Sequence, residues 1–190
     1  MNHFYNNIFG WFDEGDKNVY DRAVEKYQNG DIFVEIGSFK GRSASVMAVN
    51  IANSNKDIKF YCVDTWLGSE EHQQGSPCED IDVVNKKLFD VFLENTKSVE
   101  KYITPIRKPS VEAANDFEDN SLSFVFIDAS HDYENVKKDI NAWYPKMKSG
   151  GTLAGHDWNY HPVGNAVKDF AEANNLNIQS GGCWEIIITK

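Results

Sequence analysis

The sequence is poor in cysteine and in long apolar runs. Its 190 residues include only three cysteines, Cys62, Cys78 and Cys183, which are widely separated. An odd, scattered set builds neither a disulfide framework nor a Cys-x-x-Cys motif, so we expect a reducing compartment. No apolar run approaches the ~18 residues of a membrane span, and the first residues lack the features of a signal peptide. We therefore expect a cytoplasmic protein that does not contact membranes.

Positive charge is also scarce. The chain has 19 lysines and arginines against 29 aspartates and glutamates, a formal net charge of −10. Such an excess repels phosphate backbones and anionic lipids, so we expect no nucleic-acid partner. Hydrophobic residues make up 41% and charged residues 25%, which favours a packed core over disorder.

Short apolar runs alternate with segments of helical spacing. We expect strands at residues 32–36, 59–64, 103–106, 123–128, 152–155 and 184–189, and helices at 43–52, 133–147 and 163–174. This alternation predicts an α/β fold, a doubly wound, mostly parallel Rossmann-like sheet with helices on both faces. The length predicts one domain, 1–190. Open sheets of this kind bind ligands beyond the carboxyl ends of their strands.

The stretch 65–95 interrupts this alternation. It carries Gly68, Gly75 and Pro77 among acidic and amide residues, before a helical pattern begins near Ile81. We predict an insertion over the crevice that acts as a lid or selects the substrate. An ordinary surface excursion is the alternative.

The loop from Glu35 to Ser43 follows the first expected strand. Gly37 and Gly41 allow a sharp turn and the close approach of a ligand, while Ser38 and Ser43 add hydroxyl groups at the start of a helix. The loop matches neither Gly-x-Gly-x-x-Gly nor the Walker pattern. A dinucleotide or phosphate cradle is therefore disfavoured.

Two acidic residues add to this loop. Glu35 lies near the end of a strand expected to be buried, where its carboxylate needs a partner. S-adenosylmethionine offers an ammonium and a sulfonium group, whereas a pyrophosphate would be repelled. Asp64 ends the second strand, where it can accept hydrogen bonds from both ribose hydroxyls. The alternatives are a glutamate satisfied by its own chain and a turn or N-cap aspartate.

Residues 34–43 resemble the first motif of class I S-adenosylmethionine-dependent methyltransferases, in the branch with catechol, caffeoyl-CoA and macrolide-sugar O-methyltransferases. The resemblance extends over about residues 30–160 and implies the class I methyltransferase fold. It implies that the glycine loop faces the methionine part of the cofactor, that Asp64 holds the ribose and that Ser110 lies near the adenine. For Ser110, an N-cap role is the alternative. The predicted cofactor-binding residues are Glu35, Gly37, Ser38, Gly41, Ser43, Asp64, Ser110 and Asp128.

Two later strand ends carry aspartates with histidines nearby, at Asp128 and at His156-Asp157. Carboxylates at adjacent strand ends can hold a divalent cation, which lowers the pKa of a substrate hydroxyl group. The resemblance implies that Asp128 and Asp157 bind Mg²⁺ or another divalent cation. The family has an asparagine as third ligand, and Trp158 stands there. Asn159 or another carboxylate as a substitute, or no metal at all, are the alternatives.

His131 is the first candidate for the general base. It stands where the catechol branch carries a lysine, and an imidazole with a pKa near ~6.5 suits proton transfer at neutral pH. His156 is the second candidate, as a base or a substrate contact, and a structural role is open for both. We expect the remaining histidines at the surface, namely His3, His72 and His161.

Together these features predict methyl transfer from S-adenosylmethionine to a hydroxyl group of a small molecule, a sugar or another hydroxylated metabolite, with a divalent cation as an optional assistant. Two alternative functions are compatible with the sequence. One is a noncatalytic S-adenosylmethionine-binding protein, and the other is a nicotinamide-dependent oxidoreductase. The sequence is also compatible with a homo-oligomer.

Overall fold

The computed structural model describes residues 1–190 and contains a seven-stranded sheet with the strand order β3-β2-β1-β4-β5-β7-β6. Its strands are β1 (Ile32–Ile36), β2 (Lys59–Asp64), β3 (Thr104–Arg107), β4 (Leu122–Ile127), β5 (Met147–Gly155), β6 (Ile178–Ser180) and β7 (Trp184–Ile187). β1 to β5 run parallel, while β7 is antiparallel to both β5 and β6. The predicted doubly wound fold is confirmed, and its sheet includes β6, a strand that the sequence pattern missed.

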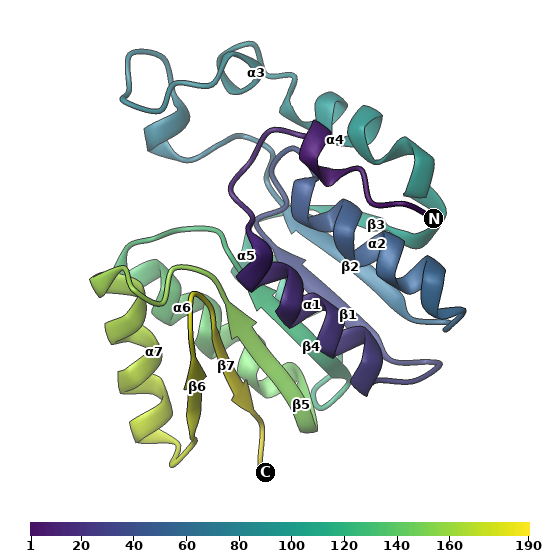
Figure 1. Ribbon diagram of the computed structural model, residues 1–190. Coiled ribbons are helices and arrows are strands. Elements are labelled where there is room, and N and C mark those ends of the chain that lie inside the picture. The colour runs from purple at the N-terminus through teal and green to yellow at the C-terminus, as the bar shows by residue number, and fades with distance from the viewer.

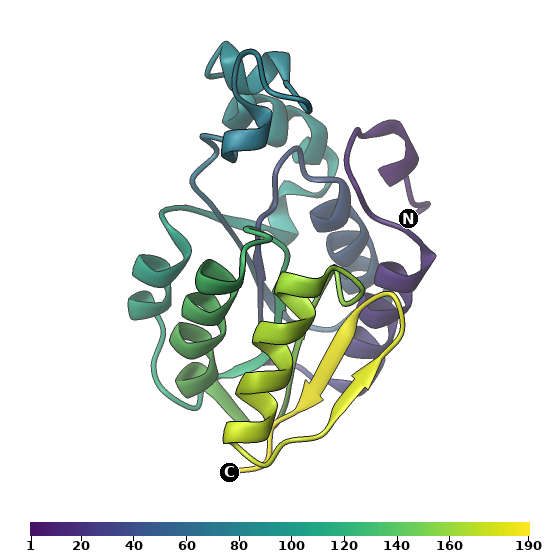
Figure 2. The ribbon, with the colours of Figure 1, turned by 90° about the vertical axis from the view of Figure 1, so that its left-hand side faces the viewer.

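Helices cover both faces of this sheet, with α1 and α2 on one face and α6 and α7 on the other (Figures 1 and 2). The helices are α1 (Glu14–Lys26), α2 (Arg42–Ser54), α3 (Ile81–Val84), α4 (Leu88–Thr96), α5 (Ser110–Ala113), α6 (Tyr133–Trp143) and α7 (His161–Ala173). The sequence pattern missed α1, which Asp13 caps by accepting hydrogen bonds from the backbone of Gly15 and Asp16. None of the helices has the length and the apolar character to cross a membrane.

The side chains of β1 alternate between two separate cores. Phe33 packs into the core beneath α1 and α2, whereas Val34 and Ile36 pack into the core beneath α6 and α7. Because side chains alternate along a strand, Glu35 shares the face of Phe33. This position determines what its carboxyl group can reach.

The strand order reverses between β1 and β4. Ile36 and Ile127, the last residues of these strands, are paired, and the backbone N–H of Asp128 donates to the carbonyl of Ile36 over 2.8 Å. The loop that contains Gly37 and the loop that contains Asp128 therefore begin side by side. This is where an open α/β sheet is expected to bind its ligand.

Two segments lie beyond the carboxyl ends of the strands (Figure 1). The first is the stretch 65–95, which includes α3 and most of α4, and its helical part begins at Ile81 as predicted. The second is the N-terminal segment, residues 5–11, which the sequence had not marked. Both approach the crevice from the same side of the sheet.

Candidate active site

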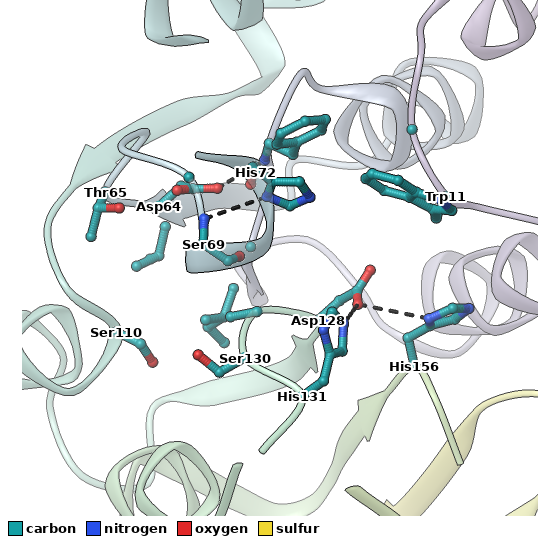
Figure 3. A pocket seen from close by; sticks show the side chains of 18 of the residues that line it. Trp11, Asp64, Thr65, Ser69, His72, Ser110, Asp128, Ser130, His131 and His156 are labelled. Carbon is teal, nitrogen blue, oxygen red and sulfur yellow. Dashed lines mark hydrogen bonds and ion pairs between the residues drawn. The ribbon is translucent and has the colours of Figure 1, made fainter. Parts of the chain in front are cut away.

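A cavity of about 610 Å³ lies at the carboxyl edge of the sheet. In Figure 3 it extends from Ser110 at one end, past Asp64, to Asp128, His131 and His156 at the other. The predicted site residues that line it are Gly37, Ser38, Ser43, Asp64, Ser110, Asp128, His131, His156 and Asp157. Two predicted residues, Glu35 and Gly41, do not line it.

The glycines of the loop after β1 are required by the packing of the protein itself. Gly37 and Gly41 have φ angles of +91° and +87°, so the predicted sharp turn is confirmed. A Cβ atom at Gly37 would lie 1.8 Å from the carbonyl oxygen of Asp128, and one at Gly41 would lie 2.6 Å from the side chain of Thr96. We expected a side chain to obstruct the ligand, but these atoms would instead collide with the neighbouring chain.

Glu35 does not line the cavity, and its side chain lies beneath α1. Its carboxyl group is only 1% exposed and accepts a hydrogen bond of 2.6 Å from the hydroxyl of Tyr20 in α1, and its Oε1 has no partner. Burial raises its pKa to about 7. Strand alternation thus directs this carboxyl group beneath α1, and its contact with the cofactor stays a prediction.

The burial of Glu35 should make the free energy of unfolding depend on pH. The pKa of Glu35 is about 7 in the folded chain against a reference of 4.5, so the unfolded chain ionises first as the pH rises. The free energy of unfolding should therefore fall by up to about 3 kcal/mol between these two pH values. Glu35→Gln keeps an acceptor for Tyr20 and should lose this dependence.

Urea unfolding of the wild type and of Glu35→Gln across that pH range measures the difference directly. Glu94→Gln, at an exposed site of α4, is the matched control and should follow the wild type. A constant difference between wild type and Glu35→Gln at every pH would contradict the account.

Asp64 connects the glycine loop to the end of β2. Its Oδ2 accepts the backbone N–H of Phe39 over 2.8 Å, and its Oδ1 accepts that of Trp66 over 2.7 Å. Burial raises the pKa of Asp64, and these backbone donors oppose the rise. Each carboxylate oxygen can accept a second hydrogen bond, so two hydroxyl groups in the cavity could still donate to it.

Ser110 is fixed at the other end of the cavity. Its Oγ accepts the indole N–H of Trp143 over 2.9 Å. The alternative N-cap role is not found, because α5 starts at Ser110 itself and Pro109 occupies the N-cap position. Asp139 of α6 lines the same end, and burial raises its pKa to about 6.

Three side chains gather where β4 and β5 end. Nε2 of His131 lies 3.0 Å from Oδ2 of Asp157 and 3.9 Å from Oδ1 of Asp128. One ligand atom from each of the three lies within 4.8 Å of the others. The hydrogen bond to Asp157 raises the pKa of His131 and holds the pKa of Asp157 below its usual range, whereas burial raises the pKa of Asp128 to about 6. This acidic cluster combines two hard oxygen ligands with one imidazole.

The third position of the cluster comes from an unexpected residue. Neither Trp158 nor Asn159 lines the cavity, and the ring of Trp158 instead lies 5.2 Å from the ammonium group of Lys168. His131 completes the set of three. The sequence had assigned it only as a base, because its loop conformation was unknown.

His156 has a carboxylate at each of its ring nitrogens. Nδ1 lies 3.2 Å from Asp157 and 3.7 Å from Asp128, while Nε2 lies 3.6 Å from Asp16 of α1. The hydrogen bond to Asp157 raises the pKa of His156 to about 9, so its ring is a cation at neutral pH. Asp16, only 1% exposed, was missed because α1 itself was missed.

The stretch 65–95 contributes several residues to the cavity wall, among them Glu71 and His72. Glu71 lies 3.5 Å from Nδ1 of His131. The expectation that His72 is a surface residue is wrong, because it is 7% exposed and its ring packs against Trp11 and Phe39, with centroid distances of 5.6 and 5.2 Å. A polar sequence context concealed this aromatic contact.

A buried cation ties the same stretch to the glycine loop. Nζ of Lys40 lies 2.7 Å from Asp80 and 2.6 Å from Asp82, and the side chain of Asn95 donates to the carbonyl of Lys40 over 2.9 Å. Lys40 is 8% exposed. The stretch 65–95 is therefore fastened to the loop that borders the cavity.

Lys40→Met is expected to loosen this attachment, because it leaves two carboxylates side by side without their cation. We expect the free energy of local opening to fall by about 2 kcal/mol, which is roughly a 30-fold faster amide exchange over residues 70–84. Hydrogen exchange followed by mass spectrometry measures it. Lys146→Met, which removes the exposed pair with Asp119, should leave those amides unchanged, and unchanged exchange in Lys40→Met would refute the attachment.

The sequence that includes the strands bordering the cavity matches the sequence model of a known protein family. The model described as "Methyltransferase domain", Methyltransf_24, matches residues 34–158, about two thirds of the chain. The chain belongs to this methyltransferase family. Membership confirms the predicted class of enzyme and S-adenosylmethionine as the cofactor of these methyltransferases.

Two relatives and a solved structure are similar to the chain. The uncharacterized protein y4gI of Sinorhizobium fredii is 25% identical over 65% of this chain and 13% of its own length. The uncharacterized protein R132 of Acanthamoeba polyphaga mimivirus is 26% identical over 80% of this chain and 63% of its own. The methyltransferase thus spans less than two thirds of either relative. The O-methyltransferase NovP shares the fold, with a TM-score of 0.69, 14% identity, and coverage of 92% of this chain and 79% of NovP.

The cavity fits the chemistry of S-adenosylmethionine. The buried hydroxyl Oγ of Ser38 lines the cavity and has no hydrogen-bond partner within the chain. Asp64 offers acceptors for ribose hydroxyls, and the N-terminus of α2 offers backbone donors. These groups are available as polar partners for the cofactor in this methyltransferase, and a contact with Glu35 stays a prediction.

Proposed function

We propose that this methyltransferase transfers a methyl group from S-adenosylmethionine to a hydroxyl oxygen of a small molecule. The observation that carries the proposal is the acidic cluster of Asp128, His131 and Asp157, which lies in the same cavity as the glycine loop and Asp64. A neutral hydroxyl group is a weak nucleophile and must lose its proton during the transfer. The cluster supplies groups that can orient that oxygen and accept the proton.

A divalent cation fits the donor set of this cluster. The carboxylates of Asp128 and Asp157 would hold it, because hard oxygen ligands suit Mg²⁺. When bound, such a cation lowers the pKa of a coordinated hydroxyl group and fixes its position. Asp128 borders Gly37 directly, so the acceptor oxygen would lie close to the loop that holds the methyl donor.

His131 is assigned the role of general base. Asp157 accepts a hydrogen bond from Nε2 of His131 and so sets the orientation of the imidazole ring. Nδ1 of the same ring faces Glu71 in the stretch 65–95. A base oriented in this way can take the hydroxyl proton as the oxygen attacks the methyl carbon. The remaining contribution of the protein is alignment of oxygen, carbon and sulfur for an in-line displacement.

The experiment is a transfer assay with methyl-labelled S-adenosylmethionine. Catechol and methyl β-D-glucoside serve as hydroxyl acceptors, each with Mg²⁺ and with a chelator, and mass spectrometry locates the label. We expect label on oxygen and a strong loss with the chelator or in Asp157→Asn. NovP, which is described as an O-methyltransferase, supports oxygen as the acceptor atom. Cofactor binding without label on either acceptor would contradict the proposal.

A further inference from the structure

The N-terminal segment forms part of the cavity wall. Phe9, Gly10 and Trp11 line the cavity, although they lie outside the residues 34–158 that match the methyltransferase family. Figure 3 shows Trp11 and His72 across the cavity from Asp128 and His156. The segment therefore borders the end at which the acceptor would bind.

The backbone of this segment is held firmly against α2. Tyr5 and Ile8 are 8% and 4% exposed. The guanidinium group of Arg42 donates to the carbonyl of Ile8 over 2.9 Å and to the side chain of Asn6 over 3.3 Å, and it lies 5.3 Å from the ring centre of Tyr5. The positions of the next residues are thus fixed by buried contacts.

Two large rings remain uncovered on this fixed backbone. Phe9 is 61% exposed and Trp11 is 54% exposed, although their ring centroids are 5.4 Å apart and Trp11 also stacks on His72 with an interplanar angle of 24°. Exposed apolar side chains that are rigidly held at a cavity wall are typical of a ligand contact. A flat ring face could complete the stack.

The charges nearby restrict the ligand further. Glu71, Asp128 and Asp157 contribute carboxylates at this end. The ammonium group of Lys40 lies 5.3 Å from the ring centre of Phe9, but Asp80 and Asp82 already pair with it. An acceptor with its own carboxylate or phosphate would meet repulsion from these three carboxylates.

We propose that Phe9 and Trp11 form the acceptor subsite and select a neutral compound with a flat apolar ring face that carries hydroxyl groups. The proposal rests on the function proposed above. The ring of the acceptor stacks on Trp11, and its hydroxyl group then points across the cavity to the acidic cluster. Specificity thus comes from the N-terminal segment as well as from the stretch 65–95.

The test is calorimetric titration of the protein saturated with S-adenosylhomocysteine, the demethylated cofactor. Two neutral ring probes, catechol and methyl β-D-glucoside, separate an aromatic from a sugar ring, and 3,4-dihydroxybenzoate adds a negative charge to the aromatic probe. We expect at least one neutral ring to bind, and Trp11→Ala and Phe9→Ala each to weaken it roughly tenfold. The benzoate should bind more weakly than catechol.

Two controls keep the outcome clear. Leu93→Ala removes an apolar side chain that is 44% exposed but does not line the cavity, so it should bind the probes as the wild type does. Trp11→Ala should bind S-adenosylhomocysteine as the wild type does. Failure of both neutral rings to bind, or unchanged affinity in both ring variants, would overturn the subsite. Binding that depends on Trp11 without any methyl transfer would instead refute the proposed function alone.

Discussion

Asp64→Ala is expected to weaken the binding of S-adenosylmethionine about 100-fold. Hydrogen bonds to a charged acceptor contribute about 1.5–3 kcal/mol each, and a ribose offers two hydroxyl donors. The substitution also leaves the backbone N–H groups of Phe39 and Trp66 without their acceptor, which releases the glycine loop from β2. Both consequences reduce affinity for the cofactor.

Calorimetry with S-adenosylmethionine measures this loss, and circular dichroism at the same temperature verifies that the variant is folded. Asp64→Asn keeps one carbonyl acceptor and should lose less. Asp90→Ala removes the same charge from an exposed site on α4 and should bind normally. If Asp64→Ala bound the cofactor within a few-fold of the wild type, the ribose assignment would be wrong.

His131→Gln is expected to slow methyl transfer by about 10²–10⁴-fold, which is the usual contribution of a positioned general base. Glutamine can still donate a hydrogen bond to Asp157, so the carboxylate keeps a partner. Since His131 does not belong to the predicted cofactor-binding set, the affinity for S-adenosylmethionine should change little. Single-turnover rates with saturating cofactor measure the effect.

His161→Gln is the matched control, because His161 is exposed at the start of α7. Affinity for Mg²⁺ supplies the second readout. A base affects the rate while metal affinity stays constant, whereas a metal ligand affects both. Loss of Mg²⁺ affinity in His131→Gln would therefore reassign His131 as the third ligand of the cluster, and an unchanged rate would remove it from the mechanism.

Much of the fold could be predicted because its strands are short, apolar and bounded by polar residues. The buried strands β1 and β2 were located with their correct ends, and β4 was placed within one residue at each end. α1 was missed because its apolar residues are few and dispersed among charges. β6 was missed because its three residues carry no alternation that a sequence pattern could reveal.

The site could be predicted only as far as strand ends determine it. Asp64, Asp128 and Asp157 follow parallel strands, so topology alone brings them to one edge of the sheet. The burial of Glu35 beneath α1 did not follow from the chemistry of a carboxylate, although strict alternation with Phe33 could have given the face it occupies. Which side chain the carboxyl group of Glu35 contacts depends on how α1 packs over β1.

The site residues that do not follow strands of the sheet could not be predicted from strand ends. Trp11 and His72 reach the cavity from the N-terminal segment and from the stretch 65–95, and Asp16 of α1 reaches His156. Their positions depend on tertiary contacts, such as Arg42 to Ile8 and Lys40 to Asp80. These contacts join segments far apart along the chain, and no local pattern records them.

The most direct test of the central claim is calorimetric titration of the wild-type chain with S-adenosylmethionine. We expect one binding site per chain, with heat that disappears when the cavity is already filled with S-adenosylhomocysteine. Absence of binding at millimolar cofactor, with and without Mg²⁺, would contradict the assignment of this cavity as the cofactor site.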